Sequence, residues 1–501
     1  MAQQAPVTGM RGAAVQGAFW SIALAVGNKA VTTVGQVALA WYLFPRDMGI
    51  VAMAASVVAL ATFFTASGID DLLVQRHDSY EQDATQVFWL SLCFNVVAMA
   101  VAVALIPFAV RHFGDGRVGR LMLIQAASWP VSTVTLVLRP QLANVLRFKA
   151  IAAIRLGEGV VFTGCAVFLA AQGWGPYALV WPTLFSAIFS AAAFWCLADR
   201  PPMGWPKPVS WPAYITPGLL LMVGNFVGVM AIQMPNFIIG SLMDARGTGL
   251  YAWGYLVASQ AIFLLVLNLR GLFTPLFSKL KSEPERLAKA TAQAAYAITA
   301  VVAPICVLQA FFARPLIETF FPARWTDAVL VVYWLSLGFC AQPVALITQA
   351  ALIAKARFGL ALRLALLQAV LGALGVAWGC LKSGIEGAAV GAAVSAVLCL
   401  PLNLWILRGE VGCSWLRLLD APKAILFGAL AFLPSWGIFW AFGGAYHWWS
   451  NAAEGVAYCA VLALVYRLFD PGMFDELSGL RSLMRGAPGK LPDLSRGEQC
   501  P

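Results

Sequence analysis

Four ionisable residues lie inside long apolar runs of the sequence, where charged side chains are rare: Lys29, Arg155, Glu158 and Arg270. A charge at the centre of a membrane-spanning helix costs about 2.5–3.5 kcal/mol on insertion scales, so each needs a partner, a water-filled cavity or a route to the interface. Lys29 and Arg270 have no acidic residue within one helical turn. A guanidinium binds phosphate oxygens bidentately and an ammonium adds a second positive charge, so this pair predicts an anion-binding site.

Lys29 is followed by Thr32, Thr33 and Gln36, at spacings of three, four and seven residues. In a helix these positions form one polar stripe, which is suited to face water or a substrate. The alternative is a lysine held inside the helical bundle by main-chain carbonyls or by an acid from another helix. For Arg270 the alternative is a side chain that reaches the lipid headgroups.

Arg155 and Glu158 are three residues apart, which favours an ion pair within one helix. A gate or a proton-coupled carboxylate is the alternative for this pair. Asn225, Gln233 and Asn236 fall within about 80° of one another around a helix and could hydrogen-bond sugar hydroxyls. Hydrogen bonding between helices explains these three amides equally well.

Metal and cofactor chemistry has no support in the sequence. The three histidines are far apart, and the ten cysteines include no C-x-x-C pair. Ligand spacings for zinc, haem and iron–sulfur clusters are therefore missing, and we expect no cofactor.

The composition predicts the elements that must position these residues. Of the 501 residues 61% are hydrophobic and only 11% charged, which is typical of a protein in a lipid bilayer. The apolar runs are continuous, as membrane helices require, and not alternating, as barrel strands would be. We expect an all-helical integral membrane protein with about fourteen spans: 18–43, 48–67, 86–110, 118–138, 150–172, 177–198, 215–241, 249–277, 290–312, 328–352, 359–381, 384–406, 422–442 and 452–468.

Most of the 33 Lys and Arg residues lie on the side of the predicted spans that the N-terminus occupies. The positive-inside rule then places both termini in the cytoplasm. The net charge of +10 is explained by contact with anionic membrane lipids, so we expect no nucleic-acid partner.

A weak internal repeat divides the spans. Gly49-Ile50-Val51-Ala52 matches Gly249-Leu250-Tyr251-Ala252, and Ala178-Leu179-Val180 matches Ala388-Ala389-Val390. Each pair is six spans apart, so the two copies have the same orientation and form two lobes around a central cavity. The predicted parts are a cytoplasmic arm (1–17), a first lobe (18–198), a cytoplasmic linker (199–214), a second lobe (215–406), two extra helices with their preceding loop (407–468), and a cytoplasmic tail with an amphipathic helix (469–501).

Several stretches resemble Wzx-type polysaccharide flippases of the multidrug/oligosaccharidyl-lipid/polysaccharide (MOP) exporter superfamily. They are LFPRDMGIVAMA (43–54), SGIDDLLVQR (67–76), GWGPYALVWPTL (173–184), NFIIGSLMDARGTGLYAWGYLVASQ (236–260) and LFTPLFSKL (272–280). The resemblance covers most of the first twelve spans, and 236–280 is its most specific part.

The resemblance implies a bacterial inner-membrane transporter with two six-helix lobes, a central cavity and two extra helices. It implies a lipid-linked oligosaccharide substrate, carried on undecaprenyl pyrophosphate, and cooperation with polysaccharide polymerase and export proteins. The family also places essential basic residues in the helices that line the cavity, which favours a role for Arg270.

Two other functions are alternatives. A cation/drug antiporter of the same superfamily (MATE-like) would need acidic residues in its cavity, whereas the intramembrane charges here are mostly basic. A membrane polysaccharide polymerase or ligase would need a substantial outward loop with catalytic residues, and the predicted outward connections are all short. We therefore expect a transporter and not an enzyme.

Overall fold

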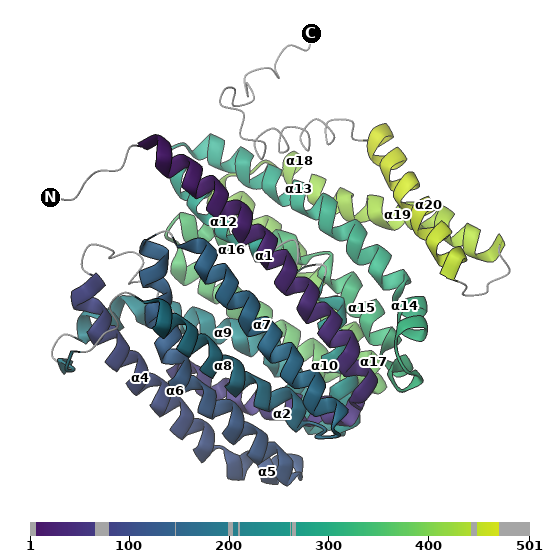
Figure 1. The fold of residues 1–501 in the computed structure, drawn as a ribbon. Coiled ribbons are helices and arrows are strands. Elements are labelled where there is room, and N and C mark those ends of the chain that lie inside the picture. Colours follow the sequence, from purple (N-terminus) through teal and green to yellow (C-terminus); the bar gives the residue numbers. More distant parts are fainter. Residues whose placement is uncertain are drawn as a thin grey trace. The chain divides into compact units, whose positions relative to one another are not determined.

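The computed structural model describes residues 7–65, 80–145, 147–198, 204–208, 211–260, 262, 267–441 and 448–469. Within these ranges the regular structure is helical throughout, with no strand, which confirms the predicted fold class. Figure 1 shows the ribbon and its element labels. The helices are α1 (Val7–Tyr42), α2 (Pro45–Ala61), η1 (Thr62–Phe64), α4 (Tyr80–Ala104), α5 (Ile106–Phe113), α6 (Gly116–Asn144), α7 (Phe148–Ala171), α8 (Tyr177–Leu197), α9 (Pro212–Leu242), α10 (Ala245–Ala258), α12 (Leu267–Lys279), α13 (Pro284–Phe311), α14 (Ala313–Phe320), η4 (Ala323–Ala328), α15 (Val329–Phe339), α16 (Gln342–Ala354), α17 (Phe358–Ile406), η5 (Leu407–Val411), α18 (Trp415–Leu418), α19 (Asp420–Ala441) and α20 (Trp448–Phe469).

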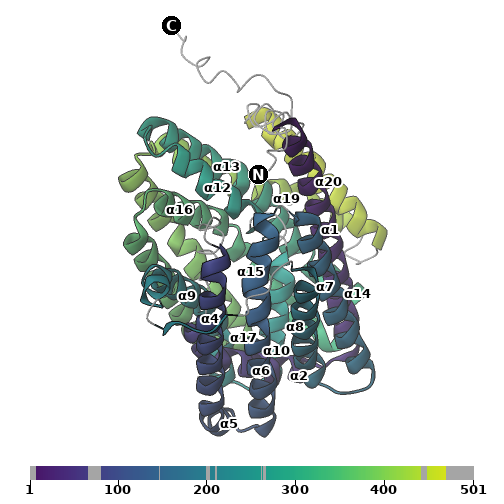
Figure 2. The same ribbon diagram turned by 60° about the vertical axis from the view of Figure 1, so that its left-hand side comes forward.

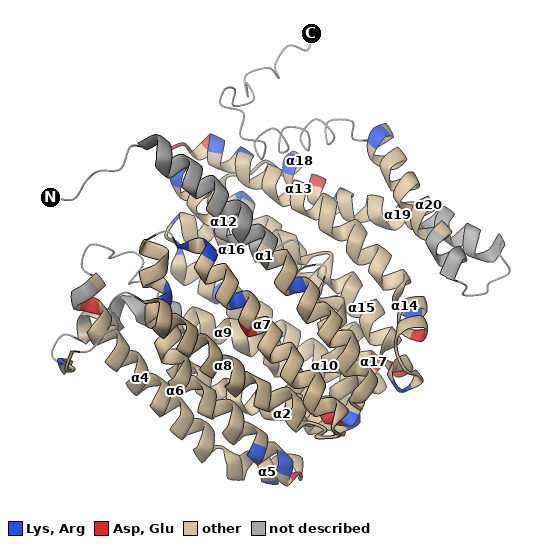
Figure 3. Ribbon diagram, in the orientation of Figure 1, with Lys and Arg blue, Asp and Glu red and all other residues tan. Residues whose placement is uncertain are grey.

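The helices are long and apolar enough for a membrane. Among the described residues, eight helical segments pass a length and hydropathy test for a span, or nine if the bent pair α15 and α16 is one span. Every predicted span falls on a helix at least in part. The total of fourteen stays a prediction. Basic and acidic positions gather toward the ends of most helices, with α1 and α7 among the exceptions (Figure 3).

The chain divides into two compact units. The first unit comprises residues 1–255, 320–331 and 362–392, and the second comprises 256–319, 332–361 and 393–501. The units are defined by contacts between residues, whereas the predicted lobes are defined by the sequence repeat. The lobe boundaries therefore stay a prediction.

In the first unit α1 runs alongside α7, while α4, α6 and α8 lie next to one another (Figures 1 and 2). Small residues allow α1 and α7 to approach closely: a Cβ on Gly35 would lie 2.2 Å from Thr163 Cγ2, and one on Gly159 would lie 1.9 Å from Asn28 Oδ1. Such small-residue contacts are a usual way to pack helices in lipid, where the hydrophobic effect gives no drive for association.

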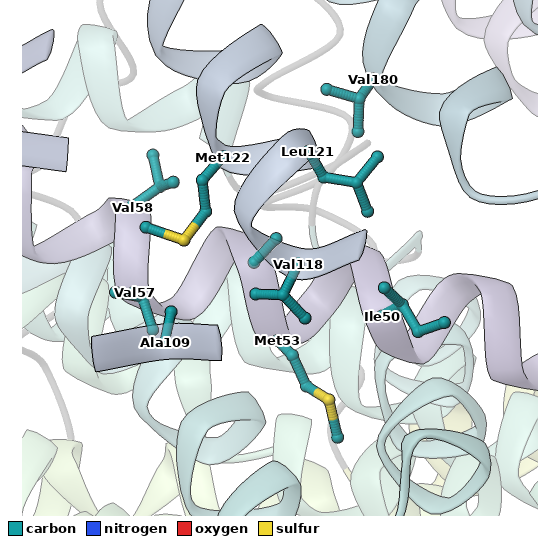
Figure 4. Packing of buried hydrophobic residues seen from close by; sticks show 10 residues of the cluster. Ile50, Met53, Val57, Val58, Ala109, Val118, Leu121, Met122 and Val180 are labelled. Carbon is teal, nitrogen blue, oxygen red and sulfur yellow. The ribbon is translucent and has the colours of Figure 1, made fainter. Parts of the chain in front are cut away.

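One cluster of buried apolar side chains in the first unit is formed by α2, α5, α6 and α8. Figure 4 shows the side chains that meet there. They are Ile50, Met53, Val57 and Val58 of α2, Ala109 of α5, Val118, Leu121 and Met122 of α6, and Val180 of α8.

The α2 and α10 helices cross at two glycines. A Cβ on Gly249 would lie 1.7 Å from Pro45 O, and a Cβ on Gly49 would lie 1.6 Å from Ala245 O. The contact is reciprocal between the two segments that the sequence repeat matches. A two-fold axis that passes between α2 and α10 would produce this pairing.

Two predicted spans, 359–381 and 384–406, form one element, α17. This element breaks at Ser383 and Gly384, where Gly384 has φ 62°. In the part within the first unit, the two arms meet through facing G-x-x-x-G motifs: a Cβ on Gly379 would lie 1.9 Å from Gly387 O, and one on Gly391 would lie 1.9 Å from Gly375 O. The arms are therefore a tightly packed helical hairpin.

In the second unit α13 packs against α19, and α19 against α20. Pro304 of α13 has no N–H, so the carbonyl of Ala300 loses its usual helical donor. The hydroxyl of Tyr466 on α20 donates to Ala300 O at 3.0 Å, and that of Tyr458 donates to Pro304 O at 2.9 Å. The carbonyl that Pro304 leaves without a helical donor is thus satisfied by a neighbouring side chain, as buried polar groups in lipid must be.

Candidate functional site

A pocket of about 570 Å³ lies within the first unit, between α6, α7 and α8. The α6 and α8 helices pack against each other, as do α7 and α8, and the pocket is at the end of this bundle where α6 ends and α7 begins. Its lining residues are Ser132, Thr135, Leu136 and Arg139 of α6, Arg155, Glu158 and Phe162 of α7, and Thr183, Ser186, Ala187, Ser190 and Phe194 of α8.

Three of the lining residues are charged: Arg139, Arg155 and Glu158. The charge of Arg155 interacts with those of both Arg139 and Glu158. Within the described part of the chain, Arg155 and Glu158 make no ion pair within 4.0 Å, with each other or with another residue. The structure therefore brings the predicted pair to one pocket together with Arg139.

The pocket also presents hydroxyl groups. Thr135 Oγ1 and Ser190 Oγ are 3.4 Å apart, so a hydroxyl of α6 contacts a hydroxyl of α8 in the lining of the pocket. Four hydroxyls donate to carbonyls of their own helix: Ser132 to Ser128 at 2.9 Å, Thr183 to Val180 at 2.7 Å, Ser186 to Thr183 at 3.1 Å and Ser190 to Ala187 at 3.2 Å. A hydroxyl that donates in this way keeps its oxygen as an acceptor, so these groups can receive hydrogen bonds from a ligand.

The predicted polar stripe on α1 lies elsewhere in the first unit. Lys29, Thr32 and Gln36 are half-buried, and Thr33 is exposed. The hydroxyl of Thr32 donates to Lys29 O at 3.0 Å. At 100° per residue the stripe is turned by about 100° from the side of α1 that packs on α7. The stripe is thus beside that contact and is not part of the pocket.

The three amides on α9 are placed as follows. Asn225 is exposed, and Gln233 and Asn236 are half-buried. Asn236 Nδ2 donates to Gln233 Oε1 at 2.8 Å, so these two side chains satisfy each other in part. Their predicted binding of sugar hydroxyls is not tested by this contact.

Arg270 is a residue of α12, but its side chain lies outside the described part of the structure. It belongs to the second unit, whereas Lys29 belongs to the first. A joint site of Lys29 and Arg270 therefore stays a prediction.

Arg139 is the functional candidate that the sequence did not reveal. We expected the fourth span to cover residues 118–138 and counted Arg139 among the charges of the cytoplasmic segment that follows. The helix α6 contains this span and continues through Pro140 to Asn144, so Arg139 is a helical residue. In the sequence Ser132 and Thr135 are three residues apart, and Ser186 and Ser190 are four apart, so each pair lies on one helical face. These spacings are the signal that polar side chains line the pocket beside Arg139.

The sequence and the structure both match known transporters. Residues 38–330 match the model of a family described as polysaccharide biosynthesis protein. The succinoglycan biosynthesis transport protein ExoT of Rhizobium meliloti (strain 1021) is 22% identical over 336 residues, which are 66% of each chain.

Two solved structures share the fold. The lipid II flippase MurJ, in an inward closed conformation, has a TM-score of 0.70 at 13% identity, over 90% of this chain and 100% of MurJ. An inward-facing multidrug resistance MATE family transporter of the MOP superfamily has a TM-score of 0.61 at 14% identity, over 77% of this chain and 94% of that one. These matches confirm the resemblance to Wzx-type flippases and a multi-pass membrane fold. Because the family model covers more than half of the sequence, the chain belongs to this family of polysaccharide biosynthesis proteins.

Proposed function

We propose that the protein is a flippase for an undecaprenyl-pyrophosphate-linked oligosaccharide repeat unit. It moves the repeat unit from the cytoplasmic to the periplasmic leaflet of a bacterial inner membrane, for exopolysaccharide, capsule or O-antigen synthesis. The observation that carries the proposal is the family match over residues 38–330. The fold shared with a lipid II flippase supports it.

In this proposal intramembrane cations bind the pyrophosphate. Lys29, on the polar stripe of α1, and Arg270, on α12, supply two positive charges, and polar helix faces admit the sugars. The prenyl chain stays in lipid. The two lobes alternate between inward-open and outward-open states, and the cations must not favour one state so strongly that the anion is never released.

No bond is broken in this cycle, so the protein acts as a transporter and not as an enzyme. Both termini face the cytoplasm, in agreement with the positive-inside rule. A polymerase and export proteins that use the flipped repeat unit are the expected partners.

The first alternative is a MATE-like cation/drug antiporter, whose fold this chain shares. A site for a cationic drug needs an excess of carboxylates, whereas the pocket holds two arginines and one glutamate. The second alternative is a polysaccharide polymerase or ligase. The family match and the relatives' transport function favour the flippase over both.

Deletion of the gene distinguishes these functions. We expect the deletion strain to lose its surface polysaccharide and to accumulate a single lipid-linked repeat unit, with unchanged sensitivity to cationic dyes. A polymerase defect would let the lipid-linked units reach the periplasmic leaflet. Unchanged polysaccharide with new dye sensitivity would reject the flippase and favour the antiporter.

Substitution tests the two predicted cations. We expect Lys29→Ala and Arg270→Ala each to reduce transport by about tenfold or more, because a charge-assisted hydrogen bond contributes about 1.5–3 kcal/mol. Transport is measured as polysaccharide output per amount of membrane-inserted protein. Lys281→Ala and Arg417→Ala serve as controls, since both residues are exposed and lie outside the predicted spans. Normal transport in both cavity variants would reject the pyrophosphate site.

A further inference from the structure

A short segment of the predicted second lobe is bound to the end of α1, a helix of the predicted first lobe. The segment is residues 320–328, which are the last residue of α14 and the whole of η4, and we call it the strap. We propose that the strap is a latch that holds the outward side of the protein closed and must leave α1 before the lipid-linked repeat unit is released there. The inference rests on the proposed function, because release on the outward side is a step of flipping.

The strap is anchored on its own lobe. Arg246 Nη2 at the start of α10 and Asp327 Oδ2 of η4 form an ion pair at 2.7 Å. The rings of Trp253 on α10 and Trp325 on η4 stack with their centroids 4.5 Å apart, and the ring of Phe321 contacts that of Trp253 edge to face at 4.9 Å. All five residues belong to the predicted second lobe, so these contacts can persist when the lobes separate.

The strap also makes hydrogen bonds to the last residues of α1. Trp325 Nε1 donates to Ala40 O at 2.8 Å, and Trp41 Nε1 donates to Phe320 O at 3.0 Å. Arg324 donates to the carbonyls of Ala40 and Trp41. A cation is favoured at this end of a helix, because the last carbonyls carry a partial negative charge. The strap is therefore fixed to one predicted lobe and hydrogen-bonded to the other.

The bonds between the strap and α1 are of a kind that can be broken and remade. Trp41 and Phe320 are 56% and 59% exposed, so water reaches this end of α1. If the strap left, the carbonyls of α1 could accept hydrogen bonds from water, as carbonyls at helix ends commonly do. Each bond would then be exchanged and not simply lost, which keeps the net cost small. Trp325 would keep its stack on Trp253, since both are in one lobe.

Two other contacts join the predicted lobes at the same ends of their helices. The first turns of α2 and α10 cross at Gly49 and Gly249. His112 Nε2 at the end of α5 lies 2.7 Å from Ser241 Oγ at the end of α9. That hydroxyl donates its proton to Phe237 O, so the imidazole is the donor in this contact. In the proposed orientation all these helix ends face outward. The strap is then one part of a closure on the outward side.

A reversible cross-link tests whether the strap must move. A short cleavable bis-methanethiosulfonate reagent would join Trp41→Cys to Phe320→Cys in cells, because both positions are exposed. We expect the cross-link to reduce new surface polysaccharide by about tenfold or more, because release on the outward side needs the open state, and a reductant to restore it. The matched control joins Arg246→Cys to Asp327→Cys, which are also exposed but lie within one lobe. It should leave the output unchanged.

Solvent access to Ala40 measures release of the strap without an assay of transport. Ala40 is fully buried, and its carbonyl accepts from two residues of the strap. A membrane-impermeant maleimide added from outside should label Ala40→Cys slowly, above the background of the protein without this substitution. Arg324→Gln and Trp41→Phe should each raise the labelling rate about threefold or more, because each removes a donor that holds the closed state.

Two outward side chains outside the latch serve as controls for the labelling. Arg314→Gln changes an arginine that pairs with Glu318 on its own helix, and Trp174→Phe changes an exposed tryptophan between α7 and α8. Neither should change the labelling rate, and thermal unfolding shows whether each variant is folded. Unchanged labelling in both folded latch variants, or normal transport by the protein cross-linked from Trp41→Cys to Phe320→Cys, would overturn the latch.

The two proposals fail separately. Accumulated lipid-linked repeat units in the deletion strain, with normal transport by the cross-linked protein, would reject the latch and retain the flippase. No accumulation in the deletion strain would reject the flippase, and the labelling of Ala40→Cys would still show whether the strap leaves α1.

Discussion

Replacing Gly249 by alanine should strongly destabilise the first unit. The new Cβ would lie 1.7 Å from Pro45 O and 2.7 Å from Gly49 N, and both are main-chain atoms of α2. A side chain could rotate away, but main chain can move only if the two helices separate. We expect a loss of about 3 kcal/mol or more, at or above the upper end of the usual cost of overpacking. Gly49→Ala should have a similar effect, because a Cβ there would lie 1.6 Å from Ala245 O.

Thermal unfolding of detergent-purified variants measures this effect. Gly164→Ala on α7 and Gly228→Ala on α9 are the matched controls, because a Cβ at either position meets nothing within 4 Å. In a helix these controls should be neutral or slightly stabilising, since alanine has the higher helix propensity. If Gly249→Ala unfolded at the same temperature as the controls, the close crossing of α2 and α10 would be wrong.

The second large effect is expected at the C-terminal end of α1, where the last carbonyls of the helix need donors. Trp325 of η4 is fully buried, and its indole Nε1 donates to Ala40 O at 2.8 Å. Arg324 donates to the carbonyls of Ala40 and Trp41. The end of α1 is therefore closed by residues nearly three hundred positions later in the chain.

Trp325→Ala should cost about 3–5 kcal/mol, the usual cost of removing a large aromatic side chain from a core. The ring is also stacked on Trp253, with centroids 4.5 Å apart. Trp325→Phe keeps most of the packing and should lose mainly the hydrogen bond, worth about 1 kcal/mol.

The control is Trp205→Ala, since the Trp205 side chain is exposed (86%) and its truncation should change stability by less than about 0.5 kcal/mol. Chemical or thermal unfolding should give Trp205→Ala nearly the stability of the unsubstituted protein. Trp325→Phe should be less stable, and Trp325→Ala the least stable of the four. Equal stability of Trp325→Ala and Trp205→Ala would show that η4 does not hold the end of α1.

These two contacts differ in what the sequence could reveal. The crossing of α2 and α10 joins the segments at Gly49 and Gly249, and their match was visible as an internal repeat. A repeat predicts which residues are equivalent, and equivalent residues near a two-fold axis are brought together. No such pattern links Trp325 to Ala40, so only the folded chain shows that contact.

The site shows the same division. Arg155 and Glu158 were found from the sequence because charge in an apolar run is conspicuous by itself. Arg139 was missed, because it follows the predicted span 118–138 directly and was counted with the charges of the next connection. Its place in the pocket depends on the continuation of α6 past Pro140 to Asn144.

The sequence by itself determined that this protein is helical, lies in a membrane and belongs to a polysaccharide biosynthesis family. These properties depend on composition, on the length of apolar runs and on local motifs, all of which act along the chain. The tertiary structure alone decided that Arg139, Arg155 and the hydroxyls of α6 and α8 share one pocket, apart from the stripe of Lys29. A pocket requires that three helices turn particular faces toward one another, and those rotations are set by side-chain packing between residues far apart in sequence.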